Sequence, residues 1–337
     1  MTSYYRPIVR FGDVPGTDVP RLAGGACWFD TVAIHRRDAP PMITAARDVP
    51  QDALHRLTAP RADVAGLSME RPRLMGILNV TPDSFSDGGQ FIEPDAALAQ
   101  AKRLLAAGAD IIDVGGESTR PGAAEVPAEE EKARTAPAIA AIRAQSKSPI
   151  SIDTRKAAVA RAAIAAGATL VNDVAAFTFD AALANVTATA QLPVCLMHAQ
   201  GDPQTMQENP CYDDVLLDVY DFLAERIATA EAAGIPRDRI IVDPGIGFGK
   251  TVQHNLVLLR DIAIFHSLGC PILLGASRKR FIGVIGGGET ASDRVGGSVA
   301  VALHAARQGV QFLRVHDIFA TRQALDLDWA MSGAAER

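Results

Sequence analysis

Eight short apolar runs between residues 74 and 317 each end in, or contain, a polar or charged residue. Longer Ala-rich stretches of helical composition separate the runs, so the pattern indicates repeated β–α units. Eight such units are the number that a closed (β/α)8 barrel requires. The polar residues at the runs are Asn79, Asp113, Asp153, Asn172 with Asp173, His198, Asp243, residues 277–280, and Arg314 with His316 and Asp317.

A barrel would bring these polar residues to one rim, because the carboxyl ends of all its strands lie at the same face. Active sites of such barrels are built there. Any single Asp or Asn after a strand is explained equally well as a turn or helix-cap residue. Carboxylates, amides and cations delivered together to one rim favour a ligand pocket.

The barrel is predicted over residues 74–330, with a C-terminal tail at 331–337. Helices are expected near residues 95–107, 128–145, 156–166, 181–190, 214–233, 255–267, 292–308 and 318–330. A glycine that favours a left-handed C-cap follows several of these segments. These glycines are Gly108, Gly167, Gly234, Gly269 and Gly309.

Residues 1–73 form a short irregular extension with many prolines, and no chemistry can be assigned to it. A strand is expected at residues 27–34 and a helix at 51–57. Trp28 and Phe29 belong to an apolar cluster that is costly to leave in water. We therefore expect the extension to pack on the barrel, away from the rim, and to add stability without affecting chemistry.

Composition narrows the class of protein. The chain has 337 residues, of which 48% are hydrophobic and 21% charged, and none of its apolar stretches approaches the ~20 residues that span a bilayer. The start lacks the basic and apolar regions of a secretory signal, so a cytoplasmic protein without membrane association is expected. A net charge of −6 argues against nucleic-acid binding. The four cysteines show no metal-ligand spacing.

The sequence does not match the common nucleotide-binding and hydrolase motifs. Residues 245–251 (GIGFGKT) invite a P-loop assignment, but Pro244 stands where that motif needs glycine. The dinucleotide fingerprint would need a glycine where Lys250 stands.

Two loops rich in glycine, hydroxyls and charges, residues 81–89 and 115–122, have the composition of loops that close over a ligand.

Eight motifs in order resemble those of the dihydropteroate synthase family of pterin-binding barrels, over roughly residues 74–330. They are GILNVTPDSFSD (76–87), DVGGESTRPG (113–122), SIDT (151–154), ND (172–173), LMH (196–198), DPGIGF (243–248), SRK (277–279) and RVHD (314–317). Each is weak alone, but the ordered set is specific. The first two discriminate against the related corrinoid methyltransferases, which share the pterin pocket.

The resemblance implies a transferase that joins 6-hydroxymethyl-7,8-dihydropterin diphosphate to 4-aminobenzoate, gives 7,8-dihydropteroate and diphosphate, and is a target of sulfonamides. Asp153 would stabilise the positive charge left on the pterin, and Lys279, Asp87 and Arg120 are the other expected catalytic residues. Mg²⁺ would bind through Asn79. The expected substrate-binding residues are Thr119, Pro121, Asp153, Asn172, Met197, Asp243, Phe248, Gly275, Lys279, Arg314 and His316.

Two features lie outside this resemblance. Arg280 stands where some family members carry a small hydroxyl residue, and it can pair with the aminobenzoate carboxylate or point to solvent. The 73-residue extension is longer than the N-terminal segment that usually precedes the barrel in the family.

A homodimer is expected. The alternatives are a catalytically silent pterin-binding or scaffolding module and a corrinoid methyltransferase.

Overall fold

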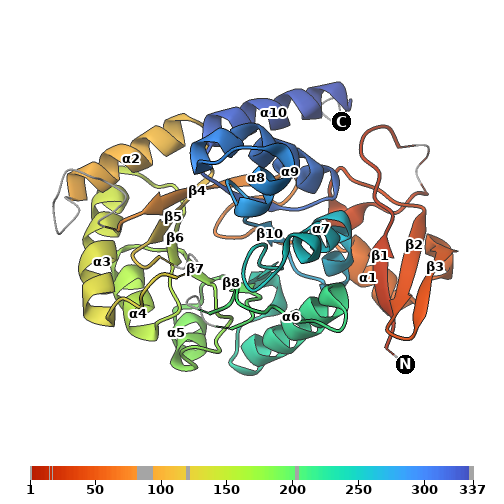
Figure 1. Cartoon of the computed structure of the whole chain (residues 1–337), viewed down its shortest axis with the longest axis horizontal. Helices are drawn as coiled ribbons and strands as arrows, with labels where there is room; N and C mark the ends of the chain where they lie inside the picture. The colour runs from red at the N-terminus through yellow and green to blue at the C-terminus, as the bar shows by residue number, and fades with distance from the viewer. Residues whose placement is uncertain are drawn as a thin grey trace.

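A computed structural model describes residues 2–14, 16, 18–81, 94–118, 122–201 and 205–333. Within them, one sheet of eight strands follows the order β10-β11-β4-β5-β6-β7-β8-β9, with every pair parallel. A parallel bridge between Val242 and Ile272 joins β9 to the segment before β10 and so closes the ring. The predicted (β/α)8 barrel is therefore confirmed (Figure 1). Its strands are β4 (Arg73–Asn79), β5 (Ile111–Gly115), β6 (Ile150–Asp153), β7 (Leu170–Asp173), β8 (Val194–Met197), β9 (Ile240–Asp243), β10 (Leu273–Leu274) and β11 (Phe312–Val315).

Helices follow the strands around the outside of the ring (Figure 1). They are α2 (Pro94–Ala106), α3 (Ala128–Gln145), α4 (Ala157–Ala166), α5 (Ala182–Ala190), α6 (Val215–Ala232), α7 (Val252–Arg260), α8 (Arg280–Gly286), α9 (Val295–Arg307) and α10 (Ile318–Met331). The helix predicted at residues 255–267 is in fact two elements, α7 and a 3-10 segment, η5 (Ile262–Leu268). The short helix α8 was not predicted.

Glycines end several of these elements as the sequence predicts. Gly108, Gly167, Gly234, Gly269 and Gly309 all have φ between +81° and +113°. This left-handed region is costly for residues with a Cβ atom. Each glycine therefore lets the chain leave a helix and turn into the next strand.

The interior of the barrel is divided into an apolar floor and a polar layer. Successive side chains of a strand point to opposite faces, so residues two apart share the interior face. The apolar floor is one buried cluster that includes Met75, Ile111, Leu170, Cys195, Ile241, Leu273 and Phe312. Two residues further along their strands lie Ile77, Asp113, Asn172, Met197, Asp243, Gly275 and Arg314. This second set, with Asp153, is the polar layer, and it stands on the floor.

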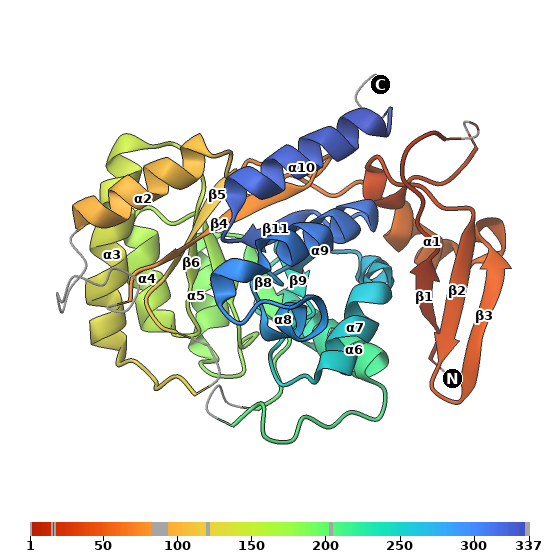
Figure 2. The ribbon, with the colours of Figure 1, turned by 45° about the horizontal axis from the view of Figure 1, so that its top comes forward.

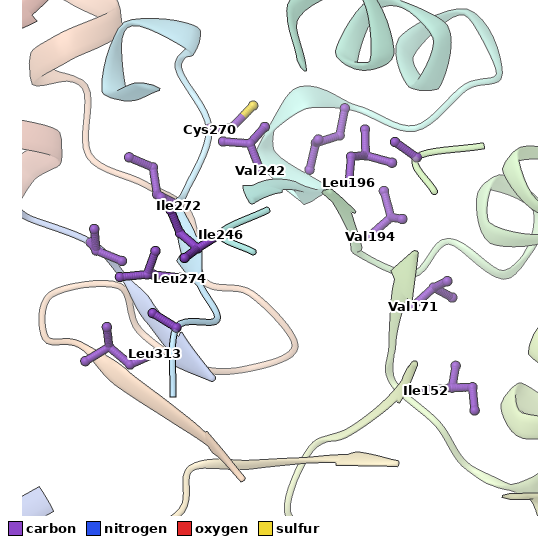
Figure 3. Close-up of a cluster of buried hydrophobic side chains, with 14 of the residues drawn as sticks. Ile152, Val171, Val194, Leu196, Val242, Ile246, Cys270, Ile272, Leu274 and Leu313 are labelled. Atoms are coloured by element: carbon purple, nitrogen blue, oxygen red, sulfur yellow. The ribbon is translucent and has the colours of Figure 1, made fainter. Parts of the chain in front are cut away.

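The outward-facing residues of the same strands pack against the helices. Ile152, Val171, Leu196, Val242 and Leu313 belong to one large buried cluster, part of which is drawn in Figure 3. All five are essentially inaccessible to solvent. Burying apolar surface on both sides of the strands stabilises the ring and fixes which face of each strand points inward.

The N-terminal extension folds as a small antiparallel sheet beside the barrel (Figure 2). Its strands are β1 (Tyr4–Pro7), β2 (Thr31–Arg36) and β3 (Ala39–Ala45), in the order β1-β2-β3, and α1 (Gln51–Thr58) follows. The strand predicted at residues 27–34 begins and ends later, as β2, whereas the helix predicted at 51–57 is present as α1. β1 and β3 were not predicted.

Two kinds of contact attach the extension. Phe29 and Leu57 are fully buried in a small apolar cluster of its own. Tyr4 instead joins the large cluster of the barrel, and its hydroxyl donates to Asp221 Oδ2 on α6 at 2.9 Å. Val64 and Met69, between α1 and β4, belong to the apolar floor, so this part of the chain covers the end of the barrel opposite the polar layer. None of the described helices combines the length and apolar composition needed to cross a bilayer.

Candidate active site

The polar layer is organised around one guanidinium group. Arg314 Nε donates to Asp113 Oδ2 at 2.6 Å, and Arg314 Nη2 donates to Asp153 Oδ2 at 2.7 Å. Asn172 Nδ2 donates to the same Asp113 oxygen at 3.2 Å. Four strands, β5, β6, β7 and β11, thus deliver side chains to one network, although their residues are up to 201 positions apart. Charge-assisted bonds of this kind are strong where water is excluded.

Two carboxylates share one cation in this network, which affects protonation. Burial is the main cause that raises the pKa of Asp153 to about 7, Arg314 opposes the rise, and the neighbouring Asp113 adds to it. Burial alone would lower the pKa of Arg314, but its two carboxylate partners outweigh burial and raise it. The charge on Asp153 is therefore sensitive to what binds beside it, which is typical of functional sites.

Asp243 and Gly275 extend the network on the other side of the ring. Burial raises the pKa of Asp243, and a hydrogen bond of 2.7 Å from the Gly245 amide to its Oδ1 opposes the rise. A Cβ atom at Gly275 would lie 3.8 Å from both Asp243 Oδ2 and Arg314 Cβ. Gly275 therefore leaves space between the two charged side chains. Met197, at the end of β8, is buried beside the Gly245 turn.

Lys279 lies over the turn that follows β9. Its Nζ is 4.3 Å from the centre of the Phe248 ring and donates to the carbonyl of Ile246. Burial lowers the pKa of Lys279 to about 7, while Asp243 opposes that shift. Lys279 and Phe248, both expected to bind substrate, are thus brought together, with the amino group on the face of an aromatic ring.

The basic run at residues 278–280 is not a single cationic cluster. Arg278 has φ +59°, and this left-handed backbone sends neighbouring side chains in different directions. Arg278 Nε donates to Asp317 Oδ2 at 2.9 Å, Lys279 turns toward Phe248, and Arg280 is exposed at the start of α8. The three cations therefore do not form one anion-binding group. Lys279 is the member of the run that joins the polar layer.

His316 sits above Arg314 on the rim. Its backbone amide donates to Ser277 Oγ at 3.3 Å, and its Nδ1 is 3.1 Å from the same oxygen. Ser277 therefore links the ends of β10 and β11. The predicted residues Arg314, inside β11, and His316, just after it, therefore lie at the same end of one strand.

Asn79 is the candidate for holding a metal ion. A Cβ atom at Gly115 would lie 3.6 Å from both Asn79 Oδ1 and Asp153 Oδ2, so the amide oxygen reaches the edge of the polar layer. The described residues hold no cluster of three or more His, Cys, Asp or Glu side chains suited to a metal. One amide oxygen fits Mg²⁺ that takes its remaining ligands from water and substrate phosphates.

Asp87, Thr119, Arg120 and Pro121 lie outside the described residues. Glu117, which lies just before Thr119, Arg120 and Pro121 in the chain, is held by buried charges. Glu117 accepts from Lys156 Nζ at 3.0 Å and from Arg155 Nε at 3.1 Å, and Lys156 also donates to Glu131 at 2.8 Å.

Asp113 was expected on the rim but was not named among the substrate-binding or catalytic residues. It lies inside β5, not at its end, and its side chain is completely buried. Its Oδ1 has no hydrogen-bond partner among the described atoms, so the polar layer contains one acceptor that is not used within the protein. A carboxylate within a run of apolar strand residues was the signal available in the sequence, because such a group is not buried without a partner.

Comparisons with known proteins agree with this geometry. A family model described as "Pterin binding enzyme" matches residues 75–316. The dihydropteroate synthase of Escherichia coli K12 is 47% identical over 276 residues, which is 82% of this chain and 97% of that protein. The dihydropteroate synthase of Haemophilus influenzae is 46% identical over 80% of this chain and 97% of its own length.

Solved structures give the same result. Xanthomonas albilineans dihydropteroate synthase with 4-aminobenzoic acid has a TM-score of 0.76 and 49% identity, covering 81% of this chain and 98% of that one. The same enzyme in complex with 7,8-dihydropteroate has a TM-score of 0.73 and 47% identity, with the same coverage. A Yersinia pestis dihydropteroate synthase with a sulfonamide drug scores 0.76 at 45% identity and covers 80% of this chain and 98% of its own. The chain belongs to the pterin-binding enzyme family, and within it to the dihydropteroate synthases.

Proposed function

We propose that this chain condenses 6-hydroxymethyl-7,8-dihydropterin diphosphate with 4-aminobenzoate. The amine nitrogen forms a bond to the exocyclic methylene carbon of the pterin, the bond from that carbon to the diphosphate oxygen breaks, and one amine proton is released. The products are 7,8-dihydropteroate and diphosphate. The observation that carries the proposal is the polar layer, where Asp113, Asp153, Asn172, Asp243 and Arg314 converge on an apolar floor.

The layer suits a pterin because the edge of that ring presents several N–H donors and acceptors in a plane. Buried carboxylates and an amide are the groups that match such an edge. We assign the ring to Asp153, Asn172 and Asp243. The apolar floor beneath them excludes water, so each polar contact counts for more than it would at the surface.

Departure of the diphosphate leaves positive charge on the pterin. Asp153 is held by Arg314 at 2.7 Å, so its negative charge is fixed in place before the reaction and would stabilise the transition state. The ring of Phe248, with Pro121, would form the apolar wall for the aminobenzoate. Lys279 would lie between the two substrates.

The diphosphate would lie at the rim, where His316 and Arg314 lie and where Thr119 is expected to offer a donor. Mg²⁺, held through Asn79 and the phosphate oxygens, would neutralise part of the leaving group's charge. Asp87 and Arg120, on the two loops, would meet over the diphosphate. We therefore expect ordered binding, with the pterin diphosphate first.

We propose in addition that the chain works in the cytoplasm as a homodimer. Helix α10 supports an interface, because Phe319, Leu327 and Met331 are 67%, 59% and 69% exposed. Their spacing places them on one face of that helix. Exposed apolar surface of this kind favours a protein partner.

The test is release of diphosphate by the purified protein with pterin diphosphate, 4-aminobenzoate and Mg²⁺. Product should form only when both substrates are present. Omission of each substrate in turn is the control. Diphosphate release without aminobenzoate, or methyl transfer from methyltetrahydrofolate to a corrinoid, would contradict the proposal. Pterin binding without turnover would favour the silent binding module.

A further inference from the structure

The turn between β9 and α7 carries an unusual set of hydrogen bonds. Three of its backbone carbonyls accept from side chains of other segments, while the Gly245 carbonyl accepts from the Phe248 amide at 3.1 Å. Gln207 Nε2 donates to Gly247 O at 2.6 Å, and Tyr212 Oη donates to Gly249 O at 2.7 Å. Lys279 donates to Ile246 O. The turn also contains Phe248, whose ring faces Lys279, so its shape determines where that ammonium lies.

Lys250, at the end of this turn, is the most buried of these donors. It is 3% exposed, and its Nζ donates to Phe248 O at 3.0 Å and to His198 O at 3.4 Å. The third neighbour of Nζ is His198 Nδ1, at 2.8 Å. These three polar atoms surround the amino group, and burial lowers the pKa of Lys250 well below its usual value. None of the ion pairs found within the described residues includes Lys250.

The two segments that Lys250 joins are packed too tightly to adjust freely. A Cβ atom at Gly245 would lie 1.8 Å from His198 O, and one at Gly249 would lie 2.4 Å from Gln200 O. Both glycines have positive φ values, +67° and +62°. The turn therefore lies directly against the segment after β8, and Lys250 is the cross-link inside that contact.

We propose that Lys250 is a positioning residue for the aminobenzoate side of the site. By tying Phe248 O to His198, it holds the Phe248 ring and the Ile246 carbonyl at the places where they contact Lys279. It touches neither substrate and acts through these two groups. This inference rests on the proposed function for its kinetic consequences, but its structural consequence is independent of turnover.

The kinetic test is Lys250→Met, which keeps the length of the side chain and removes the donors. Losing these buried bonds should raise the KM for 4-aminobenzoate about tenfold or more and change the KM for the pterin diphosphate less than about threefold. Lys147→Met is the matched control, because Lys147 is exposed in the segment between α3 and β6, far along the chain from the turn. Equal changes in both KM values, or no change, would overturn the proposal.

The structural test uses lysine-labelled protein and NMR, which is feasible because the chain has six lysines. In Lys250→Met the Lys279 signal should move, and its titration midpoint should rise from about 7, because a loosened wall admits water. In Lys147→Met both the Lys279 signal and its titration midpoint should stay unchanged. An unchanged Lys279 signal in Lys250→Met would refute the positioning role, whether or not the wild type turns over substrate.

A milder variant covers the case in which Lys250→Met does not fold. Tyr212→Phe removes one hydroxyl from the same turn and keeps the ring. It should shift the KM for aminobenzoate and the Lys279 signal in the same direction, by a smaller amount. A normal melting temperature together with a normal Lys279 signal in this variant would contradict the account. Absence of turnover in the wild type would refute the proposed function instead.

Discussion

The polar layer of the barrel and the N-terminal extension are held by opposite kinds of interaction. In the polar layer, Arg314 binds two carboxylates, of which the Asp113 side chain is 0% exposed and the Asp153 side chain 9% exposed. In the extension, Arg37 also binds two carboxylates, Asp218 and Asp221, but its side chain is 39% exposed. The same chemical arrangement is therefore strongly coupled in one place and screened by water in the other.

This difference indicates where each region draws its stability. A buried charge without its partner is costly, so the polar layer depends on its ion pairs. A surface pair contributes little, so the extension must depend on its apolar cluster around Phe29 and on Tyr4. We expect the two regions to respond differently to loss of charge and to loss of apolar volume.

Arg314→Met should give the largest effect. It leaves two buried carboxylates without their cation and should cost about 3–5 kcal/mol of stability. Activity should be lost as well. Urea denaturation followed by circular dichroism measures the stability change. A change below about 1 kcal/mol would mean that water already screens the layer.

Phe29→Ala tests the extension through its core. The side chain is fully buried, so its removal should cost about 3–5 kcal/mol if the extension unfolds together with the barrel. Both KM values should stay near those of the wild type. Ile43→Ala is the control, since Ile43 belongs to the same extension and is 59% exposed. Selective loss of affinity for one substrate would show that the extension belongs to the active site.

The pH dependence of kcat/KM should give the next largest effect. Burial raises the pKa of Asp153 to about 7, so the reactive carboxylate form is lost as the pH falls below that value. Burial lowers the pKa of Lys279 to about 7, so its ammonium form is lost as the pH rises above it. The profile should be a narrow bell with a maximum near neutrality and about a tenfold loss per pH unit on either side. A flat profile on the acid side would show that Asp153 stays ionised or is not required.

Arg37→Met should have the smallest effect. Both of its ion pairs, at 2.7 Å to Asp218 and Asp221, are exposed enough for water and salt to screen them. The loss should be below about 1 kcal/mol and should shrink in high salt. Denaturation at low and high salt measures it. A loss comparable to that of Arg314→Met would remove the contrast between the two regions.

Much of the barrel could be predicted from the sequence because its signals are local. Apolar runs that stop at a polar residue marked all eight strands, and a glycine after a helix marked five turns that have positive φ. Asn172, Asp243 and Arg314 were expected on one rim because strand ends in a closed barrel converge, whatever their distance along the chain.

Other features could not be predicted because they depend on contacts between distant segments. Asp113 acquires its role from Arg314, which lies 201 positions away. The separate directions of Arg278 and Arg280 follow from one left-handed residue, which the sequence does not mark. β1 and β3 are short strands whose pairing is fixed by β2, and β3 is largely exposed, so it lacks a strong alternating pattern.

Turnover by Asp153→Asn tests the central claim most directly. The amide keeps the shape of the side chain and removes the negative charge that faces the pterin. The account predicts a normally folded protein whose kcat is lower by a hundredfold or more, which corresponds to about 3–4 kcal/mol of barrier. A folded variant with turnover within a few fold of the wild type would contradict the assignment of catalysis to the polar layer.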